Sequence, residues 1–390
     1  MKSLLLTIIS FTFLFCNVNT NNKQLSVQNP VQENEITLEV SPYINQKSEI
    51  NQKLIKTLSE FFKTRKDSHI ENKYWLPFDF EQFIYPYFDI SEYCYGGGKY
   101  GDFIFYPSLM EIIKTKSPDK WILKIAFMEN DTKTQQHTVL GIYNIIAQQI
   151  DENIYLSRFV NYATEQWKII KTEYITYKIS PQKNPNQSEI LQQETDIKEL
   201  LTFFDTEPIH ITYYSCKNPK ELFEIKGFDY HLMMYSNDTG GLAENGNIIF
   251  SGNNSEIYTH EIAHIYIMNL FPNKNIFLDE GLATYIGGSG GNNYLWHREK
   301  MKSFFNETPD FRFDQYNDPY GVYFKNETPV LYMISALICE RTIRLYGKEK
   351  LFELFDTKAD LWDLLEKVGL NKDNINEELR KEITLSPLLF

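Results

Sequence analysis

Three residues in the second half of the chain, His260, Glu261 and His264, have types and spacing that could do chemistry. Residues four apart project from the same face of an α-helix, so His260 and His264 can each turn a ring nitrogen toward one tetrahedral zinc ion. Glu261 lies beside that pair, where its carboxylate can accept a proton from a zinc-bound water. The pattern therefore predicts a zinc site whose two histidine ligands and general base come from one helix.

A third protein ligand is required, because a catalytic zinc ion binds three protein ligands and keeps its fourth position for water. A metzincin would carry a glycine at position 267 and a third histidine at position 270, but the sequence has Ile267 and Leu270 there. The nearest suitable donor is Glu280, which follows a turn at Pro272 and lies in the segment LDEGLATY, residues 278–285. We expect a second short helix, antiparallel to the first, to bring Glu280 to the metal.

The helix that positions the histidines has a start and a stop in the sequence. Asn253, Asn254 and Ser255 offer N-cap side chains before it, and Pro272 ends it. Between these limits apolar residues recur at a spacing that predicts a thick buried face: Ile257, Ile262, Ile265, Ile267, Met268 and Leu270. A lone HExxH also occurs by chance on core helices, but here the expected carboxylate segment follows it.

His260, Glu261, His264 and Glu280, together with the segment LDEGLATY, resemble the gluzincin metallopeptidases, and most closely the peptidase MA-like branch. In that clan an HExxH helix is followed by a helix that carries a glutamate ligand. The resemblance covers roughly the last half of the chain. It implies a Zn²⁺ ion bound by the two histidines and Glu280, with Glu261 as the general base in peptide-bond hydrolysis. The interval of fifteen residues between His264 and Glu280 is shorter than in the thermolysin-like and aminopeptidase-like groups.

The resemblance also implies a second electrophile, commonly a tyrosine or a histidine, in the region after the zinc ligands. The sequence offers three tyrosines there, with Tyr323 as our working assignment: Tyr320, Tyr323 and Tyr332.

Residues Gly241 to Asn245 are similar to the G-x-M-E-N segment by which some aminopeptidases hold a substrate amino terminus, with Ala243 in place of the methionine. On that interpretation Gly241 and Glu244 bind substrate, and Glu244 anchors an α-amino group. The favoured alternative is a turn that ends in an edge strand bordering the cleft, to which an extended peptide could add.

Composition bounds the class of protein. At 390 residues the chain is long enough for more than one domain, and its 42% hydrophobic residues are typical of a globular protein. A net charge of −13 argues against nucleic acid and against an anionic membrane surface as partners. We therefore expect no nucleic-acid partner, and the resemblance to metallopeptidases implies a peptide or protein substrate.

The N-terminus predicts export. Residues 1–22 have a basic start at Lys2 and an apolar stretch from Leu4 to Phe15 that is too short to span a bilayer, as in a signal peptide. Cys16 after this stretch raises lipidation as an alternative, and only then would a membrane be a partner. Residues 23–49, rich in asparagine, glutamine and glutamate, predict a flexible tether. The mature protein would be secreted, periplasmic or on the cell surface.

The rest of the chain predicts an α+β fold. Residues 50–180 contain one amphipathic helix and then strand-like runs, which favours a helix on an antiparallel sheet with a cystatin-like or NTF2-like pattern. The polar, proline-broken residues 181–189 predict a linker. Residues 190–390 are expected to form a mostly helical gluzincin-like metallopeptidase domain with a small edge-strand sheet. Cys94 and Cys216 could pair in an oxidising compartment.

The sequence thus predicts an exported zinc-dependent metallopeptidase. The alternative is a non-catalytic surface or periplasmic binding protein that contains zinc. Glu261 argues against this alternative, because a structural zinc site has no use for a base.

Overall fold

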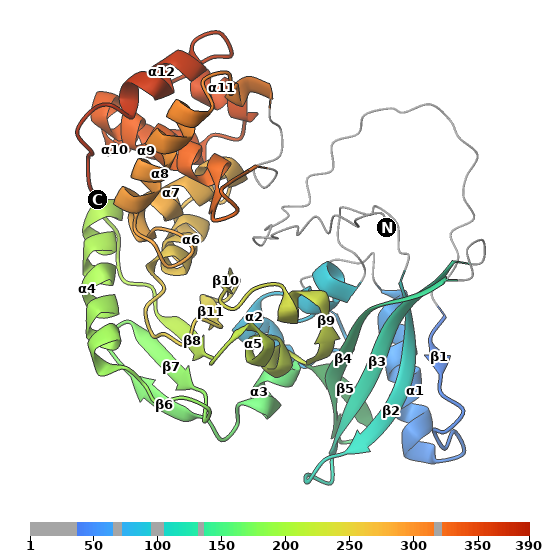
Figure 1. Cartoon of the computed structure of the whole chain (residues 1–390). Helices are drawn as coiled ribbons and strands as arrows, with labels where there is room; N and C mark the ends of the chain where they lie inside the picture. The colour runs from blue at the N-terminus through green and yellow to red at the C-terminus, as the bar shows by residue number, and fades with distance from the viewer. Residues whose placement is uncertain (1–36, 65–71, 95–104, 132–135, 316–321) are drawn as a thin grey trace.

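The computed structural model describes residues 37–64, 72–94, 105–131, 136–315 and 322–390, which form an α+β fold (Figure 1). A six-stranded sheet lies at one end of the molecule and the C-terminal helices lie at the other, with a five-stranded sheet between them. The predicted signal segment, Cys16 and most of the predicted tether lie outside the described residues.

The six-stranded sheet has the order β1-β2-β3-β4-β5, and β9 also pairs with β4. Its pairings are antiparallel, except that β1 runs parallel to β2. The strands are β1 (Glu39–Val40), β2 (Tyr106–Lys114), β3 (Lys120–Asp131), β4 (Gln136–Ile150), β5 (Asn153–Ser157) and β9 (Phe228–His231). Strand β1 falls within the segment predicted as a tether, so the end of that segment is structured.

Helix α1 (Glu49–Lys63) packs on this sheet. Its buried residues Leu54, Leu58 and Phe61 follow the three-to-four-residue spacing of a single apolar stripe. They share one core with Leu123 and Ile125 of β3. Shorter elements complete this part of the fold: α2 (Pro77–Phe83), η1 (Ile90–Cys94), α3 (Phe159–Ala163), α5 (Pro219–Lys226) and η2 (Leu232–Tyr235).

The five-stranded sheet has the order β10-β11-β8-β7-β6. Its three central strands are parallel and its two edge strands are antiparallel to their neighbours. The strands are β6 (Lys168–Lys171), β7 (Ile175–Ile179), β8 (Ile211–Ser215), β10 (Gly241–Glu244) and β11 (Ile248–Ser251). Strand β10 therefore lies at an edge, as the favoured interpretation of that segment predicted.

The predicted boundary at residues 181–189 does not separate the two sheets. Strands β6 and β7 precede it but belong to the five-stranded sheet, and β9 follows it but pairs with β4 of the six-stranded sheet. Parallel pairing of β7 with β8 requires a crossover connection, and the polar segment simply leads into the helix of that crossover, α4 (Gln187–Phe204). A division at this point would split both sheets.

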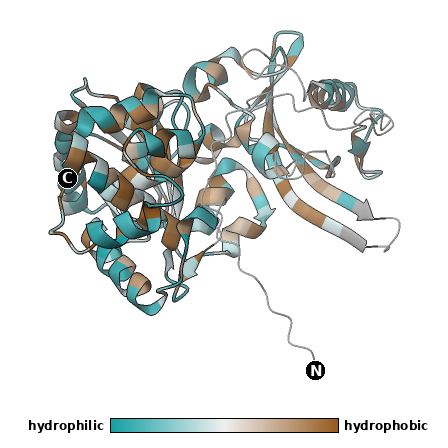
Figure 2. Cartoon of the chain, turned by 90° about the horizontal axis from the view of Figure 1, so that it is seen from above, coloured by the Kyte–Doolittle hydropathy of each residue, from teal (hydrophilic) through white to brown (hydrophobic). Residues whose placement is uncertain are grey.

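Helices make up most of the remaining chain. They are α6 (Thr259–Leu270), α7 (Ile276–Gly287), α8 (Tyr294–Glu307), α9 (Val330–Tyr346), α10 (Lys348–Asp356), α11 (Leu361–Glu366) and α12 (Ile375–Glu382), with η3 (Phe313–Gln315) and a short pairing of β12 (Tyr323–Phe324) with β13 (Thr328–Pro329). Their hydrophobic stretches alternate with hydrophilic ones (Figure 2).

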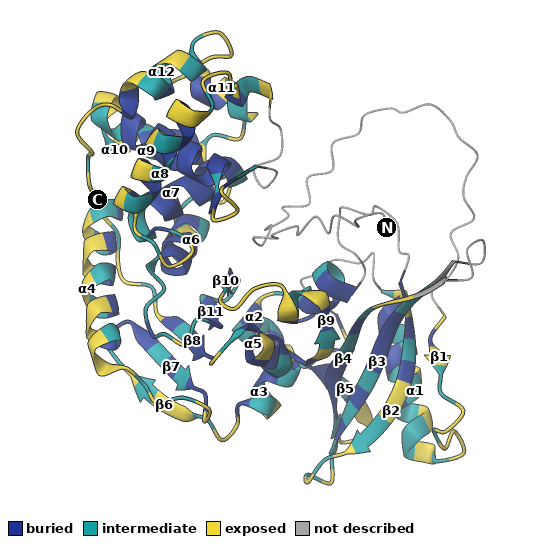
Figure 3. Cartoon of the chain, in the orientation of Figure 1, coloured by how far each residue is buried: buried dark blue, intermediate teal, exposed yellow. Residues whose placement is uncertain are grey.

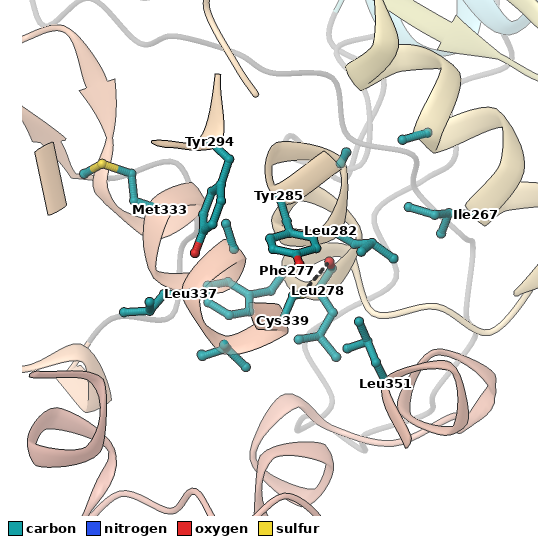
Figure 4. Packing of buried hydrophobic residues seen from close by; sticks show 14 of the residues in the cluster. Ile267, Phe277, Leu278, Leu282, Tyr285, Tyr294, Met333, Leu337, Cys339 and Leu351 are labelled. Carbon is teal, nitrogen blue, oxygen red and sulfur yellow. Dashed lines mark hydrogen bonds between the residues drawn. The ribbon is translucent and has the colours of Figure 1, made fainter. Parts of the chain in front are cut away.

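Helix α7 is buried along almost its whole length (Figure 3). Leu278, Leu282 and Tyr285 project from it into a core shared with Leu337 and Cys339 of α9 (Figure 4). By contrast, α4 presents an exposed face to solvent. The helix expected to carry the third metal ligand is thus fixed from several sides.

The cysteines do not form the suggested pair. Cys94 and Cys216 are both buried and free, and Cys339 is a free cysteine buried in the core. Among the described residues, no helix combines the length and apolar character needed to cross a membrane.

Replacing Gly281 with alanine is expected to destabilise the protein, because a Cβ there would lie 2.1 Å from Ser335 Oγ and 2.6 Å from the Ser335 backbone carbon. Overpacking of this kind costs about 1–3 kcal/mol, which exceeds the gain of under about 1 kcal/mol from alanine's helix propensity. Urea unfolding of G281A measures the loss. The double variant G281A/S335G should recover part of it, and unchanged stability of G281A would contradict the close contact between α7 and α9.

Candidate metal centre

Helices α6 and α7 pack together and bring His260, His264 and Glu280 to one point, as the sequence predicted. The Nε2 atoms of the two histidines are 3.2 Å apart, and each lies 3.5 Å from Oε2 of Glu280. A tetrahedral ion with bonds of about 2.0–2.1 Å separates its ligand atoms by roughly 3.3 Å. The three side chains are therefore already spaced as ligands of one such ion.

The other ring nitrogen of each histidine has its own acceptor. His260 Nδ1 donates to the carbonyl oxygen of Gly288 at 2.6 Å, and His264 Nδ1 donates to Asp279 Oδ1 at 2.7 Å. Because a carbonyl or a carboxylate can only accept, Nδ1 carries the proton in both rings. In the neutral rings, both Nε2 lone pairs then point into the shared space, as in histidines that bind a metal through Nε2.

Glu280 completes the group with a buried carboxylate. Its side chain is only 7% exposed, and its Oε2 atom is buried without a hydrogen-bond partner. Burial favours protonation of this carboxyl, but His264 and His260 outweigh it and lower the pKa of Glu280 to about 2. Two imidazole nitrogens and an ionised carboxylate that converge in this way fit a divalent cation.

Glu261 lies beside this group and faces strand β10. Its Oε2 accepts a hydrogen bond from the backbone N–H of Ala243 at 2.8 Å. Burial raises the pKa of Glu261 above its ordinary value, and Glu280 adds to the rise, although both histidines and the Ala243 N–H oppose it. A carboxylate with a raised pKa is better suited to take and return a proton near neutral pH.

The start of α6 is held by α4 and not by its own N-cap. The sequence predicted caps from Asn253 to Ser255, but the N-cap residue is Tyr258, whose side chain makes no capping bond. Instead, Gln193 Oε1 accepts from the Tyr258 N–H at 2.6 Å, and the Thr259 hydroxyl donates to Asp196 Oδ2 at 2.5 Å. Residues of α4 thereby fix the turn that carries His260.

The glycines at the C-terminal end of α7 allow close approach to the first histidine. A Cβ at Gly287 would lie 2.3 Å from the backbone nitrogen of His260, so only glycine fits there without movement. Gly288 has a φ of 72°, and its carbonyl oxygen accepts the hydrogen bond from His260 Nδ1. These glycines therefore orient a ligand.

Comparison with protein-family models, curated proteins and solved structures gave no match. The geometry of the site therefore carries the functional argument.

The structure does not support Glu244 as an anchor for a substrate amine. Its carboxylate is 4% exposed and contacts Arg158 Nη1 at 2.7 Å and the Lys226 ammonium. Burial alone would raise the pKa of Glu244, but Arg158 and Lys226 lower it to about 2. Gly241 is at the start of β10, where a Cβ would lie 2.5 Å from the Tyr258 ring. Both residues shape the edge strand.

Tyr323 does not lie on helices α6 and α7, which carry the proposed ligands. It lies in β12, opposite Pro329 of β13. Tyr332 is buried within α9, and Tyr320 lies outside the described residues.

A different tyrosine, Tyr258, was missed by the sequence reasoning. Burial raises its pKa well above the ordinary value, and the neighbouring carboxylates of Glu261 and Glu280 raise it further. The signal that could have identified Tyr258 is its position directly before the helix of the histidines.

Proposed function

We propose that this protein is a zinc-dependent metallopeptidase, with His260, His264 and Glu280 as metal ligands and Glu261 as general base. The observation that carries the proposal is the spacing of 3.2–3.5 Å among two imidazole nitrogens and one carboxylate oxygen, which matches the ligand spacing around a tetrahedral ion. A non-catalytic zinc protein would need the three ligands, but it would not need a buried carboxylate beside them with a raised pKa.

Each residue of the proposed site would have its own role in hydrolysis. A bound zinc ion would act as a Lewis acid on the scissile carbonyl and on a water molecule. Glu261 would take the proton of that water and return it to the leaving amine. Tyr258 lies near enough to Glu261 for that carboxylate to raise its pKa, so its neutral hydroxyl is our candidate donor to the oxyanion, in place of Tyr323.

The wider proposal keeps the predicted architecture and location. Helices α6 to α12 would be the gluzincin-like catalytic part, with the peptide or protein substrate lying along the edge strand β10. The helix on the antiparallel sheet would correspond to the cystatin-like or NTF2-like pattern. Residues 1–22 would direct export. The alternative is an exported binding protein that contains a zinc site but hydrolyses no peptide.

Metal removal and restoration test the proposal. We expect the purified protein to contain about one zinc ion per chain, and dialysis against a strong chelator to abolish cleavage of a peptide library read by mass spectrometry. Added zinc should restore the same cleavage products, because the ligands lie on helices fixed by the core. Zinc binding with no cleavage of any peptide would leave the binding-protein alternative. Cleavage that survives complete zinc removal would refute a metallopeptidase.

A further inference from the structure

A buried cluster of four charged side chains lies beside the edge strand β10. It consists of Asp89, Arg158, Lys226 and Glu244, none more than 4% exposed at the side chain. Arg158 contacts Asp89 at 2.6 Å and Glu244 at 2.7 Å. Lys226 contacts Asp89 at 2.8 Å and also contacts Glu244. With two carboxylates and two cations, the cluster is neutral and each charge has two opposite partners.

A buried cluster of this kind fixes the relative positions of the segments that carry it more than it stabilises the fold. Burying an ion costs several kcal/mol, and apolar residues of similar volume often stabilise a core as well or better. What apolar residues do not supply is a fixed set of short, directional contacts. Arg158 is held further by its backbone N–H, which donates to Asp79 Oδ2 at 2.7 Å, and by the Phe83 ring 4.6 Å from its guanidinium carbon.

The four charges come from four separate segments. Asp89 precedes η1, Arg158 precedes α3, Lys226 ends α5, and Glu244 is the last residue of β10. Of these segments, β10 is the one with a hydrogen bond to the metal centre, from the Ala243 N–H to Glu261. Glu244 is therefore the link between the metal centre and the part of the chain that contains α2, η1 and α3.

The turn after β10 is held by the same region. Gly246 has a φ of 84°, and a Cβ there would lie 2.3 Å from the backbone oxygen of Gln82 at the end of α2. Asn245 and Glu244 lie close to Phe83, Tyr85 and Phe88. The strand and its turn are thus both seated on residues 82–89.

The residue before Glu244 donates a hydrogen bond to the metal centre and not to the charged cluster. Ala243 adjoins Glu244, and its backbone N–H is the group that binds Glu261 at 2.8 Å. In its own sheet β10 pairs only with β11, so that sheet fixes it from one side. A shift of β10 away from Arg158 and Lys226 would move the Ala243 N–H relative to Glu261.

We propose that Arg158 is a positioning residue of the metal centre, which holds Glu244 and thereby keeps the Ala243 N–H on Glu261. The catalytic consequence of this inference rests on the proposed peptidase function. The region before residue 160 is then a structural part of the active centre and not a separable accessory domain.

Two double variants with equal charge changes test the proposal. E244Q/K226M leaves the Arg158–Asp89 pair and releases β10 from its charged contacts. D89N/K226M removes one acid and the same lysine but leaves Arg158 bound to Glu244, so β10 stays attached. Each variant keeps a neutral cluster, and neither changes a residue that contacts the metal. Zinc content and thermal unfolding are measured for both.

We expect E244Q/K226M to lose roughly 10- to 100-fold in kcat/KM with zinc content unchanged, because misplacement by about 1 Å has effects of this size. D89N/K226M should stay within about threefold of the wild type at a similar unfolding temperature. Hydrogen exchange of residues 241–244 should accelerate by at least about tenfold in the first variant only. If E244Q/K226M does not fold, R158K keeps the charge but loses the forked guanidinium that contacts Asp89 through Nη2 and Glu244 through Nη1, and the same changes are expected.

Equal losses of kcat/KM and equal exchange rates in the two double variants would overturn the positioning role, since a purely stabilising cluster would respond to both alike. The exchange measurement does not depend on catalysis. If the wild type cleaves no peptide but exchange accelerates only in E244Q/K226M, the positioning of β10 stands and the proposed peptidase function fails.

Discussion

Replacing Glu261 with glutamine is expected to lower kcat by about 10²–10⁴-fold without loss of zinc, because proton transfer by a positioned side chain contributes rate enhancements of that size. Glutamine has nearly the same shape, and its amide oxygen can still accept from the Ala243 N–H that now binds Glu261 at 2.8 Å. The change therefore removes the base while leaving strand β10 in place. Steady-state hydrolysis of a peptide identified from the library measures the effect.

The matched control is E299Q, which makes the same chemical change at an exposed position of α8. It should retain the full rate. A Glu261→Gln protein that binds zinc and hydrolyses the peptide as fast as E299Q would remove Glu261 from the mechanism. If the wild type were also inactive, the peptidase proposal would fall with it.

Replacing Glu280 with alanine is expected to weaken zinc binding by more than about 100-fold. The Glu280 carboxylate supplies the only charged ligand of the proposed set, and its Oε2 atom is buried without another partner. Loss of a direct ligand should exceed the 10–100-fold loss that follows changes to residues behind the ligands. Competition with a chromophoric chelator measures the affinity.

Asp279→Asn provides the graded comparison, because Asp279 accepts from His264 Nδ1 at 2.7 Å and does not point at the ion's position. We expect it to fall within the 10–100-fold range. Equal affinity losses for E280A and D279N would show that Glu280 acts no more directly than Asp279.

The local patterns of this sequence were enough to predict the arrangement of the metal centre. The spacing of His260, Glu261 and His264 specifies a helix face, and the glutamate after a proline turn specifies its partner helix. The convergence of these three proposed ligands follows from chemistry within about twenty residues, as does the burial of the helices. A single stretch of the sequence therefore contains the spacing that predicts how the three proposed ligands converge.

What the sequence could not show depends on contacts between distant segments. The side chains of α4 that secure the start of α6 are more than sixty residues away in the chain, as in the Gln193 bond to Tyr258. The ion pairs of Glu244 link it to Arg158, 86 residues earlier, so the same GLAEN segment that resembles a substrate anchor is instead engaged internally. The strand order could not be predicted for the same reason. The polar composition of residues 181–189 does not reveal which sheet the strands on either side of this segment join.

The interleaving of the two sheets bears on how the protein folds. The six-stranded sheet lacks β9 until residue 231 has been synthesised, and β7 lacks its β8 neighbour until residue 215. Such long-range pairings raise the contact order, which slows folding and delays the burial of apolar surface. A fragment ending near residue 180 would expose the unpaired edges of β4 and β7, so co-translational folding of the first half as a finished unit is not expected, and the whole chain should unfold cooperatively.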